Sequence, residues 1–273
     1  MQERHLWFIG KVRILRVLTA EHLERGLGLL ASGIIFPLYI FPGDPGICAN
    51  WTPLFNSIST NPDLQFHVIV NPASGPGTDP QPSTSYQSCV ALLKSPNVNV
   101  YGYVFTDFGN REEADVIADV DLYAGWGTAY VPDGIFFDQV LGTEDNLDKY
   151  TGYAEHTRQS FGGGSGLVTL NPGAEPTTDY FNIVDLIVTS EVFFTDFNTA
   201  NVTIGPSAPA SKQAIILHDA PSTVPTALVD ELVGTDKIGA LYITDDVQAN
   251  NMNPYDSFPS DWDAFVSAVV SAQ

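Results

Sequence analysis

The chain has 273 residues, of which 44% are hydrophobic, and this is enough material for one large core. Its formal net charge is −21, which argues against a function that depends on binding nucleic acid or an anionic membrane. Such an acidic surface suits a secreted protein, or one that acts on a neutral or cationic polymer.

Residues 1–31 differ from the rest of the chain. They mix basic and apolar residues, and charges interrupt every apolar run. No run reaches the roughly 20 residues of a membrane span, and the pattern is too broken for a good signal peptide. This segment has no defined role: it could be an amphipathic helix, a degenerate targeting segment or a misassigned gene start. We expect residues 32–273 to form a single domain.

From Gly33 onward, apolar runs alternate with amphipathic stretches. Strands are predicted at 33–39, 66–71, 98–106, 134–138, 166–171, 184–191, 213–218 and 238–244. Helices are predicted at 51–59, 84–94, 111–126, 146–161, 223–232 and 261–270, with weaker signals after the fifth and sixth strands. This alternation is typical of an α/β protein with a parallel sheet, and eight units in about 240 residues match a (β/α)8 TIM barrel. An open doubly wound sheet is the alternative, although no GxGxxG or P-loop motif follows the first strand.

The stretch from Asp133 to Gln139 carries the main functional signal. Gly134 to Phe137 include nothing polar, which predicts a strand buried on both faces. The strand ends in a carboxylate and an amide, Asp138 and Gln139. Parallel α/β sheets present catalytic groups at this edge, and the alternative is that Asp138 caps the next helix.

Polar side chains follow nearly every predicted strand at its C-terminal end. They are Tyr39, Asn71, Thr106-Asp107, Asp138-Gln139, Asn171, Glu191, His218-Asp219 and Thr244-Asp245. Because TIM-barrel active sites lie at this rim, the pattern predicts one ring of site residues, although some of them could only cap helices or loops. Aromatic residues at the same edges, among them Phe41, Tyr103 and Tyr242, could stack on sugar rings or simply pack in the core.

Asp138 and Glu191 end the fourth and sixth strands. Neighbouring strands lie about 4.8 Å apart, so two steps place these side chains within about 5–10 Å of each other. That range covers both geometries of glycoside hydrolysis, which needs one protonated and one ionised carboxyl group. No Lys or Arg is nearby in the sequence, so burial could raise the pKa of one carboxyl group. The alternative is two unconnected carboxylates.

Other chemistries lack a motif. The sequence contains no HxH, HExxH or Cys/His cluster for zinc and no GxSxG nucleophile elbow, and nothing in it calls for a metal or an organic cofactor. His218 could contact a sugar hydroxyl or could be a satisfied histidine at a strand end.

Cys48 and Cys89 are the two cysteines of the chain. Together with the sequons at Asn50 and Asn201, a disulfide between them would indicate an oxidising, extracellular setting. Two free buried thiols are the alternative.

Several strings resemble the spherulin-4 family, which is glycoside hydrolase family 135. They are Gly33–Tyr39, Trp51–Leu54, Val68–Gly77, Gly102–Thr106, Tyr123–Trp126, Asp133–Asp138, Asn171–Gly173 and Glu191. The resemblance runs from Gly33 to about Asp246. It implies a (β/α)8 barrel in a secreted or cell-surface protein, with endo-acting cleavage of α-1,4-linked N-acetylgalactosamine in galactosaminogalactan-like polymers.

The resemblance also implies catalytic carboxylates at Asp138, position 139 and Glu191. Position 139 is Gln here, where the family pattern has Glu, and an amide does not exchange a catalytic proton at neutral pH. If that Glu is the acid or the nucleophile, this protein is slow or inactive. If Asp138 and Glu191 carry the chemistry, Gln139 only hydrogen-bonds the sugar.

We therefore predict a glycoside hydrolase, monomeric, whose partner is a polysaccharide that contains galactosamine. Asp138, Glu191 and Gln139 are the candidate catalytic residues. The candidate substrate-binding residues are Tyr39, Asn71, Thr106, Asn171, His218, Tyr242 and Asp245. A non-catalytic glycan-binding protein of the cell surface or wall is the alternative, which Gln139 favours.

Overall fold

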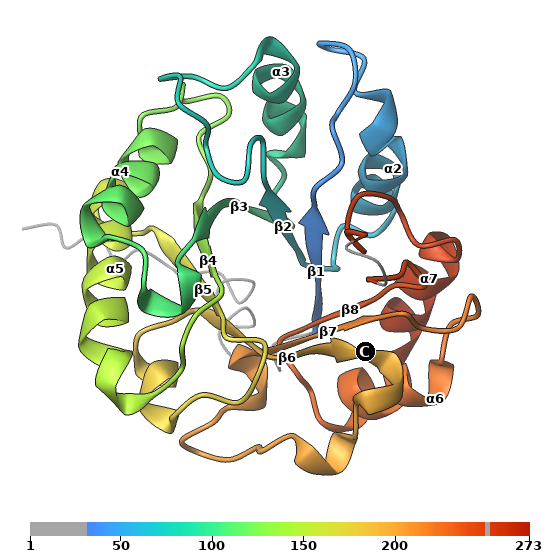
Figure 1. Cartoon of the computed structure of the whole chain (residues 1–273). Coiled ribbons are helices and arrows are strands. Elements are labelled where there is room, and N and C mark those ends of the chain that lie inside the picture. Colours follow the sequence, from blue (N-terminus) through green and yellow to red (C-terminus); the bar gives the residue numbers. More distant parts are fainter. Residues whose placement is uncertain (1–31, 249–251) are drawn as a thin grey trace, which may run out of the picture.

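The protein is described here by a computed structural model that covers residues 32–248 and 252–273, so the expectation for segment 1–31 lies outside the described residues. Eight parallel strands close into a barrel in chain order, with helices around it (Figure 1). The strands are β1 (Gly33–Leu38), β2 (Phe66–Val70), β3 (Val98–Phe105), β4 (Gly134–Asp138), β5 (Leu167–Asn171), β6 (Leu186–Phe193), β7 (Gln213–His218) and β8 (Ala240–Ile243). The predicted TIM-barrel fold is confirmed.

The helices outside the barrel are α2 (Thr52–Thr60), α3 (Thr84–Leu93), α4 (Glu113–Ala124), α5 (Leu147–Ser160), α6 (Thr226–Val229) and α7 (Trp262–Ala272). After β5 and β6, where the helical signal is weak, the described chain forms only short 3-10 turns such as Thr178–Asn182 and Thr199–Asn201. The helix predicted at 223–232 begins three residues later, at Thr226, and only its first turn is α-helical, because α6 passes into a π-helical segment at Asp230–Thr235.

The run Gly134–Phe137 is buried on both faces, as its composition predicts. Ile135 and Phe137 pack in the layer between barrel and helices, whereas Phe136 belongs to a second cluster with residues such as Tyr103. Gly134 is required because β4 and β5 approach closely here. A Cβ at this position would lie 2.0 Å from the carbonyl oxygen of Leu167.

A disulfide joins Cys48, in the loop after β1, to Cys89 in α3, so the predicted pair is confirmed. It ties the rim of the barrel to the outer layer of helices. Within residues 32–248 and 252–273, no helix combines the length and apolar character needed to cross a membrane.

Candidate active site

Asp138 and Glu191 meet at the C-terminal mouth of the barrel, on either side of Asn171. The side-chain nitrogen of Asn171, at the end of β5, donates to Asp138 Oδ1 at 2.7 Å and to Glu191 Oε2 at 2.5 Å. The two acceptor oxygens can be no further apart than these bonds laid end to end, 2.7 Å and 2.5 Å, or 5.2 Å. The two carboxylates therefore share one small space.

Each carboxylate also accepts a hydrogen bond from a tyrosine hydroxyl. Tyr103 donates to Asp138 Oδ2 at 2.7 Å, and Tyr255 donates to Glu191 Oε1. The ring of Tyr39 lies edge-on to both, with centroid distances of 5.6 Å to Tyr103 and 5.7 Å to Tyr255. Three aromatic rings thus form one wall around the pair of acids.

The turn after β5 holds Asn171 and Glu191 together. Asn171 Oδ1 accepts from the backbone N–H of Gly173 at 3.0 Å, which orients the amide nitrogen toward the carboxylates. The backbone N–H of Glu191 donates to the carbonyl oxygen of Gly173 at 3.0 Å. Gly173 has a φ of 63°, which glycine adopts without steric cost, so this residue lets one turn contact both groups.

Glu191 faces the mouth because β6 is irregular. Val188 packs in the same cluster as Phe136, and in a regular strand a residue three positions later would face the opposite side of the sheet. The register of β6 against β7 shifts between Val188 and Ser190, which adds one residue and reverses the alternation. The bulge therefore turns Glu191, and not Ser190, toward Asn171.

The pKa of Asp138 is raised to about 6. Burial disfavours the ionised form, and the nearby Glu191 carboxylate adds charge repulsion. Hydrogen bonds from Tyr103, from the backbone of Gln139 and from Asn171 act in the opposite direction. Asn171 Nδ2 can only donate, whereas a tyrosine hydroxyl can donate or accept, so the proton of a neutral Asp138 belongs on Oδ2 beside Tyr103.

Gln139 does not continue the strand. Its φ is 51°, and its carbonyl oxygen accepts from the hydroxyl of Thr106 at 2.8 Å and from the backbone N–H of Phe108 at 2.7 Å. The Gln139 side chain is half-buried and forms no hydrogen bond with the residues that the structure describes. Of Asp138 and Gln139, Asp138 is the residue whose side chain shares a hydrogen-bond donor, Asn171, with Glu191.

The structure brings Tyr39 and Asn171 to the carboxylates and leaves Asn71 on the same rim. Asn71 follows β2, and its Oδ1 accepts from the backbone N–H of Gly75 at 2.8 Å. Thr106 is 1% exposed, and its hydroxyl donates to the backbone oxygen of Asp138 at 2.8 Å. Thr106 therefore supports the end of β4 and does not offer its hydroxyl to a ligand, contrary to the expectation.

The other three predicted sugar contacts have structural roles. Tyr242 is 0% exposed and packs against Phe36 at 5.2 Å between ring centroids, so the assignment of Tyr242 to substrate is wrong. Asp245 accepts from the backbone N–H of Ser260 at 2.9 Å and thereby fastens the loop that carries Tyr255. His218 is 3% exposed, and its Nδ1 lies 2.8 Å from Asp219 Oδ2, as expected of a satisfied histidine at a strand end.

The contacts of Tyr103 and Tyr255 with the two acids were not predicted from the sequence, in which Tyr103 is one of several aromatic residues expected to stack on a sugar or pack in the core. Tyr103 stands two residues before the end of β3, and its aromatic character at that edge was the available signal. Tyr255 lies in the loop between β8 and α7, distant in sequence from both acids. No spacing rule connects such a loop residue to Glu191.

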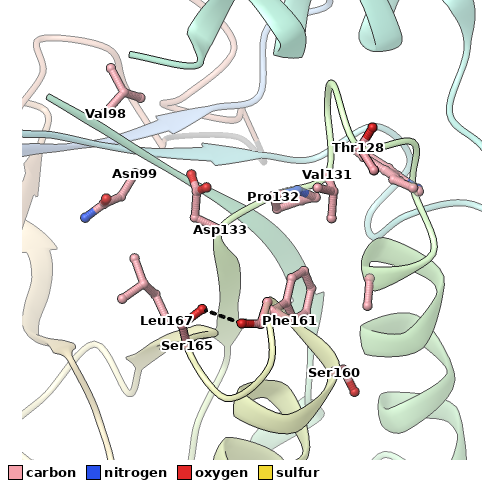
Figure 2. A pocket seen from close by; sticks show the side chains of 13 residues that line it. Val98, Asn99, Thr128, Val131, Pro132, Asp133, Ser160, Phe161, Ser165 and Leu167 are labelled. Carbon is pink, nitrogen blue, oxygen red and sulfur yellow. Dashed lines mark hydrogen bonds between the residues drawn. The ribbon is translucent and has the colours of Figure 1, made fainter. Parts of the chain in front are cut away.

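A separate cavity lies at the opposite end of the barrel. It has a volume of about 490 Å³ and is lined by residues at the N-terminal ends of β3, β4 and β5, including Asn99, Asp133 and Leu167 (Figure 2). The Asp133 carboxylate there is paired with Lys94 at 2.8 Å. This cavity contains neither carboxylate of the pair at the mouth. The described residues also include no cluster of His, Cys, Asp and Glu suited to a metal ion.

Comparison with known proteins agrees with this architecture. A family model described as spherulation-specific family 4 matches residues 33–269. Spherulin-4 of Physarum polycephalum is 28% identical over 220 residues, and the match covers 78% of this chain but only 63% of that protein. The crystal structure of Aspergillus clavatus Sph3 in complex with GalNAc has a TM-score of 0.77 at 28% identity, covering 89% of this chain and 98% of that one. The chain therefore belongs to spherulation-specific family 4.

Proposed function

We propose that the protein is an endo-acting glycoside hydrolase that cleaves polymers of α-1,4-linked N-acetylgalactosamine and galactosamine. The observation that carries the proposal is the pair Asp138 and Glu191, held at the mouth of the barrel by one shared donor, Asn171. The relative Sph3, solved with GalNAc, supports the choice of sugar. Acidic side chains in a chain of net charge −21 also favour a polymer that carries free amines.

Asp138 is the general acid in this proposal, because its raised pKa lets it keep a proton near pH 6. Glu191 is the nucleophile. The limit of 5.2 Å between their nearest oxygens favours the retaining geometry, in which carboxyl groups lie about 5–5.5 Å apart, over the wider inverting geometry.

The reaction then takes two steps. A Glu191 oxygen attacks the anomeric carbon while the glycosidic C–O bond breaks, and the leaving oxygen takes the proton of Asp138. The ionised Asp138 next removes a proton from water, whose oxygen attacks the same carbon and releases Glu191. Gln139 takes no part in the proton transfers and remains available to hydrogen-bond the sugar.

The test is incubation of the purified protein with galactosaminogalactan, followed by detection of released oligosaccharides. Asp138→Asn and Glu191→Gln should each lower the rate by about 10³-fold or more, because each removes one half of the chemistry. Near-wild-type release by either variant would exclude the assignment. Gln139→Glu is run beside them, and unchanged activity is expected if the pair alone carries the reaction.

A non-catalytic glycan-binding protein is the second candidate, and Gln139 is the observation that favours it. This candidate predicts binding of the polymer without release of fragments, and a gain of hydrolysis in Gln139→Glu. The same assay therefore separates the two functions.

We also place the protein outside the cell or at its surface, as a monomer. The disulfide between Cys48 and Cys89 supports an oxidising compartment. Asn50 and Asn201 of the two sequons are both exposed, which is compatible with glycosylation.

A further inference from the structure

A second hollow lies on the same rim as the carboxylates, beside the loops that follow β1 and β2. Its volume is about 290 Å³, near the lower end of the range for small-molecule sites. The residues that define it are Phe41, Pro72, Thr78, Asp79, Ser83 and Tyr86. None of its lining residues carries a positive charge.

Phe41 lines this hollow and is 56% exposed overall, although it is a large apolar side chain. One side of the ring is packed, since it lies at 6.0 Å and 74° to the ring of Tyr86. The rest of the ring is open to solvent. Ligand sites are typically lined by aromatic and apolar side chains with a few polar groups, and the lining of this hollow has that composition.

The loop that carries Phe41 is held in place before any ligand arrives. Asn50 donates to the carbonyl oxygen of Phe41 at 2.9 Å, and the indole N–H of Trp51 donates to that of Ile40 at 2.8 Å. The disulfide from Cys48 to Cys89 fastens the same loop to α3, the helix that carries Tyr86. Binding therefore costs little ordering entropy in this loop.

The hollow neighbours the catalytic mouth along two loops of the chain. Phe41 follows Tyr39 by two residues, which limits the distance between their backbones to about 7 Å. Tyr39 contacts Tyr103 and Tyr255, the donors to the two acids. On the other side, Pro72 of the hollow follows Asn71 of the rim. If a polymer is bound in the mouth, a sugar unit one or two positions away from those at the cleaved bond would lie over this hollow.

The lining matches the chemistry of an amino sugar. The exposed part of the Phe41 ring suits the apolar face of a pyranose ring. Asp79 is exposed and forms no ion pair with any described residue, so its carboxylate can accept from an ammonium, an amide N–H or a hydroxyl group. An anionic sugar is disfavoured, because the only charge in the lining is negative.

We propose that this hollow is a distal subsite, in which Phe41 stacks on a hexosamine unit of the polymer outside the cleavage point. The inference rests on the proposed function for its substrate class. In this proposal Phe41 determines the preference for longer oligosaccharides, and it lies on the loop that the disulfide holds in place.

The experiment compares Phe41→Ala, Phe41→Tyr and Leu92→Ala with the wild type on galactosamine-containing oligosaccharides from disaccharide to octasaccharide. Leu92 is the matched control, since it is an apolar residue on α3 that is 57% exposed and lies outside the hollow. Hydrolysis and equilibrium binding are both measured, and thermal unfolding confirms that each variant is folded.

Phe41→Ala should raise KM and Kd for long oligosaccharides by about tenfold, with kcat and the values for the shortest substrates unchanged. Phe41→Tyr keeps the ring and should behave as wild type, and so should Leu92→Ala. An equal effect of Phe41→Ala at every chain length, or no effect at any, would overturn the subsite. If the wild type binds but never cleaves, the proposed hydrolysis fails, whereas the length-dependent loss of binding still decides the subsite.

Discussion

The carboxylates of Asp138 and Glu191 accept hydrogen bonds from one nitrogen atom, Asn171 Nδ2. This arrangement lets two negative charges occupy one space, because a donor between them offsets part of their repulsion. Removing the Asn171 side chain should therefore lower the rate of hydrolysis more than removing a side chain that contacts only one of the two acids.

Asn171→Ala should raise the pKa of Asp138 further, because a hydrogen bond that favours its ionised form is lost. The alkaline limb of the pH–rate profile should move to higher pH. The value of kcat should fall by about 10–100-fold, because the two acids lose the donor that positions both of them. The measurement is kcat as a function of pH on galactosaminogalactan. An alkaline limb at the same pH as in the wild type would show that Asn171 does not influence the pKa of Asp138.

Hydrolysis by the wild type should decline above about pH 6, where Asp138 loses the proton that it donates. The expected profile of kcat has an alkaline limb with an apparent pKa near 6. A rate that stays constant from about pH 5 to about pH 8 would argue that Asp138 is not the acid.

Tyr103→Phe should also move this limb to higher pH, because Tyr103 donates to Asp138 Oδ2 and lowers its pKa. Tyr255→Phe is the matched control, since it removes the same hydroxyl from the other acid, Glu191. The shift should be larger for Tyr103→Phe than for Tyr255→Phe. Equal shifts would mean that the two tyrosines act only through the shared packing of the mouth.

The same pKa has a consequence for stability. Folding raises the pKa of Asp138 from 3.8 to about 6, so the native state binds more protons than the unfolded state in between. The stability that Asp138 contributes is present below about pH 3.8 and is lost as the pH rises through 6. At neutral pH the ionised side chain costs on the order of 1–3 kcal/mol.

Asp138→Asn should therefore unfold at a higher temperature than the wild type at about pH 8, with a smaller difference at about pH 4. Thermal unfolding followed by circular dichroism at both values checks this. Thr106→Ser is a useful reference, because it keeps the hydroxyl that supports the end of β4 without changing any charge. If Asp138→Asn is destabilised equally at both pH values, ionisation of Asp138 does not lower the stability of the native state.

The disulfide should contribute about 2–4 kcal/mol to the free energy of unfolding, since it closes a loop between residues 41 apart in sequence. Cys48→Ala with Cys89→Ala should lower the midpoint of denaturant unfolding by a corresponding amount. Reduction of the wild type gives an independent measure, and a midpoint unchanged by both treatments would show that hydrogen bonds alone hold the loop.

Local patterns were enough for the barrel. The eight apolar runs became strands, and Gly134–Asp138 has the predicted bounds, because a run without polar groups has few other ways to satisfy its backbone. The same patterns placed Asp138, Asn171 and Glu191 at one rim, since parallel strands bring their C-terminal ends together.

The face of the sheet that each side chain takes was harder to predict than the strands themselves. A period of two decides which face a strand residue takes, and one inserted residue reverses it. The bulge in β6 turns Glu191 inward, and Tyr242 points into packing with Phe36, although both stand near the ends of their strands. The sequence carried no visible mark of either outcome.

The amino-acid sequence by itself determined the closed parallel barrel and the two acids at one mouth, because these follow from hydrophobic period and strand order. Only the tertiary structure decided that the two cysteines are bonded, that Asn171 joins the acids, and that Tyr255 contacts Glu191 from a distant loop. Contacts of this kind depend on bulges, turns and loop paths, which arise from packing between segments far apart in the chain.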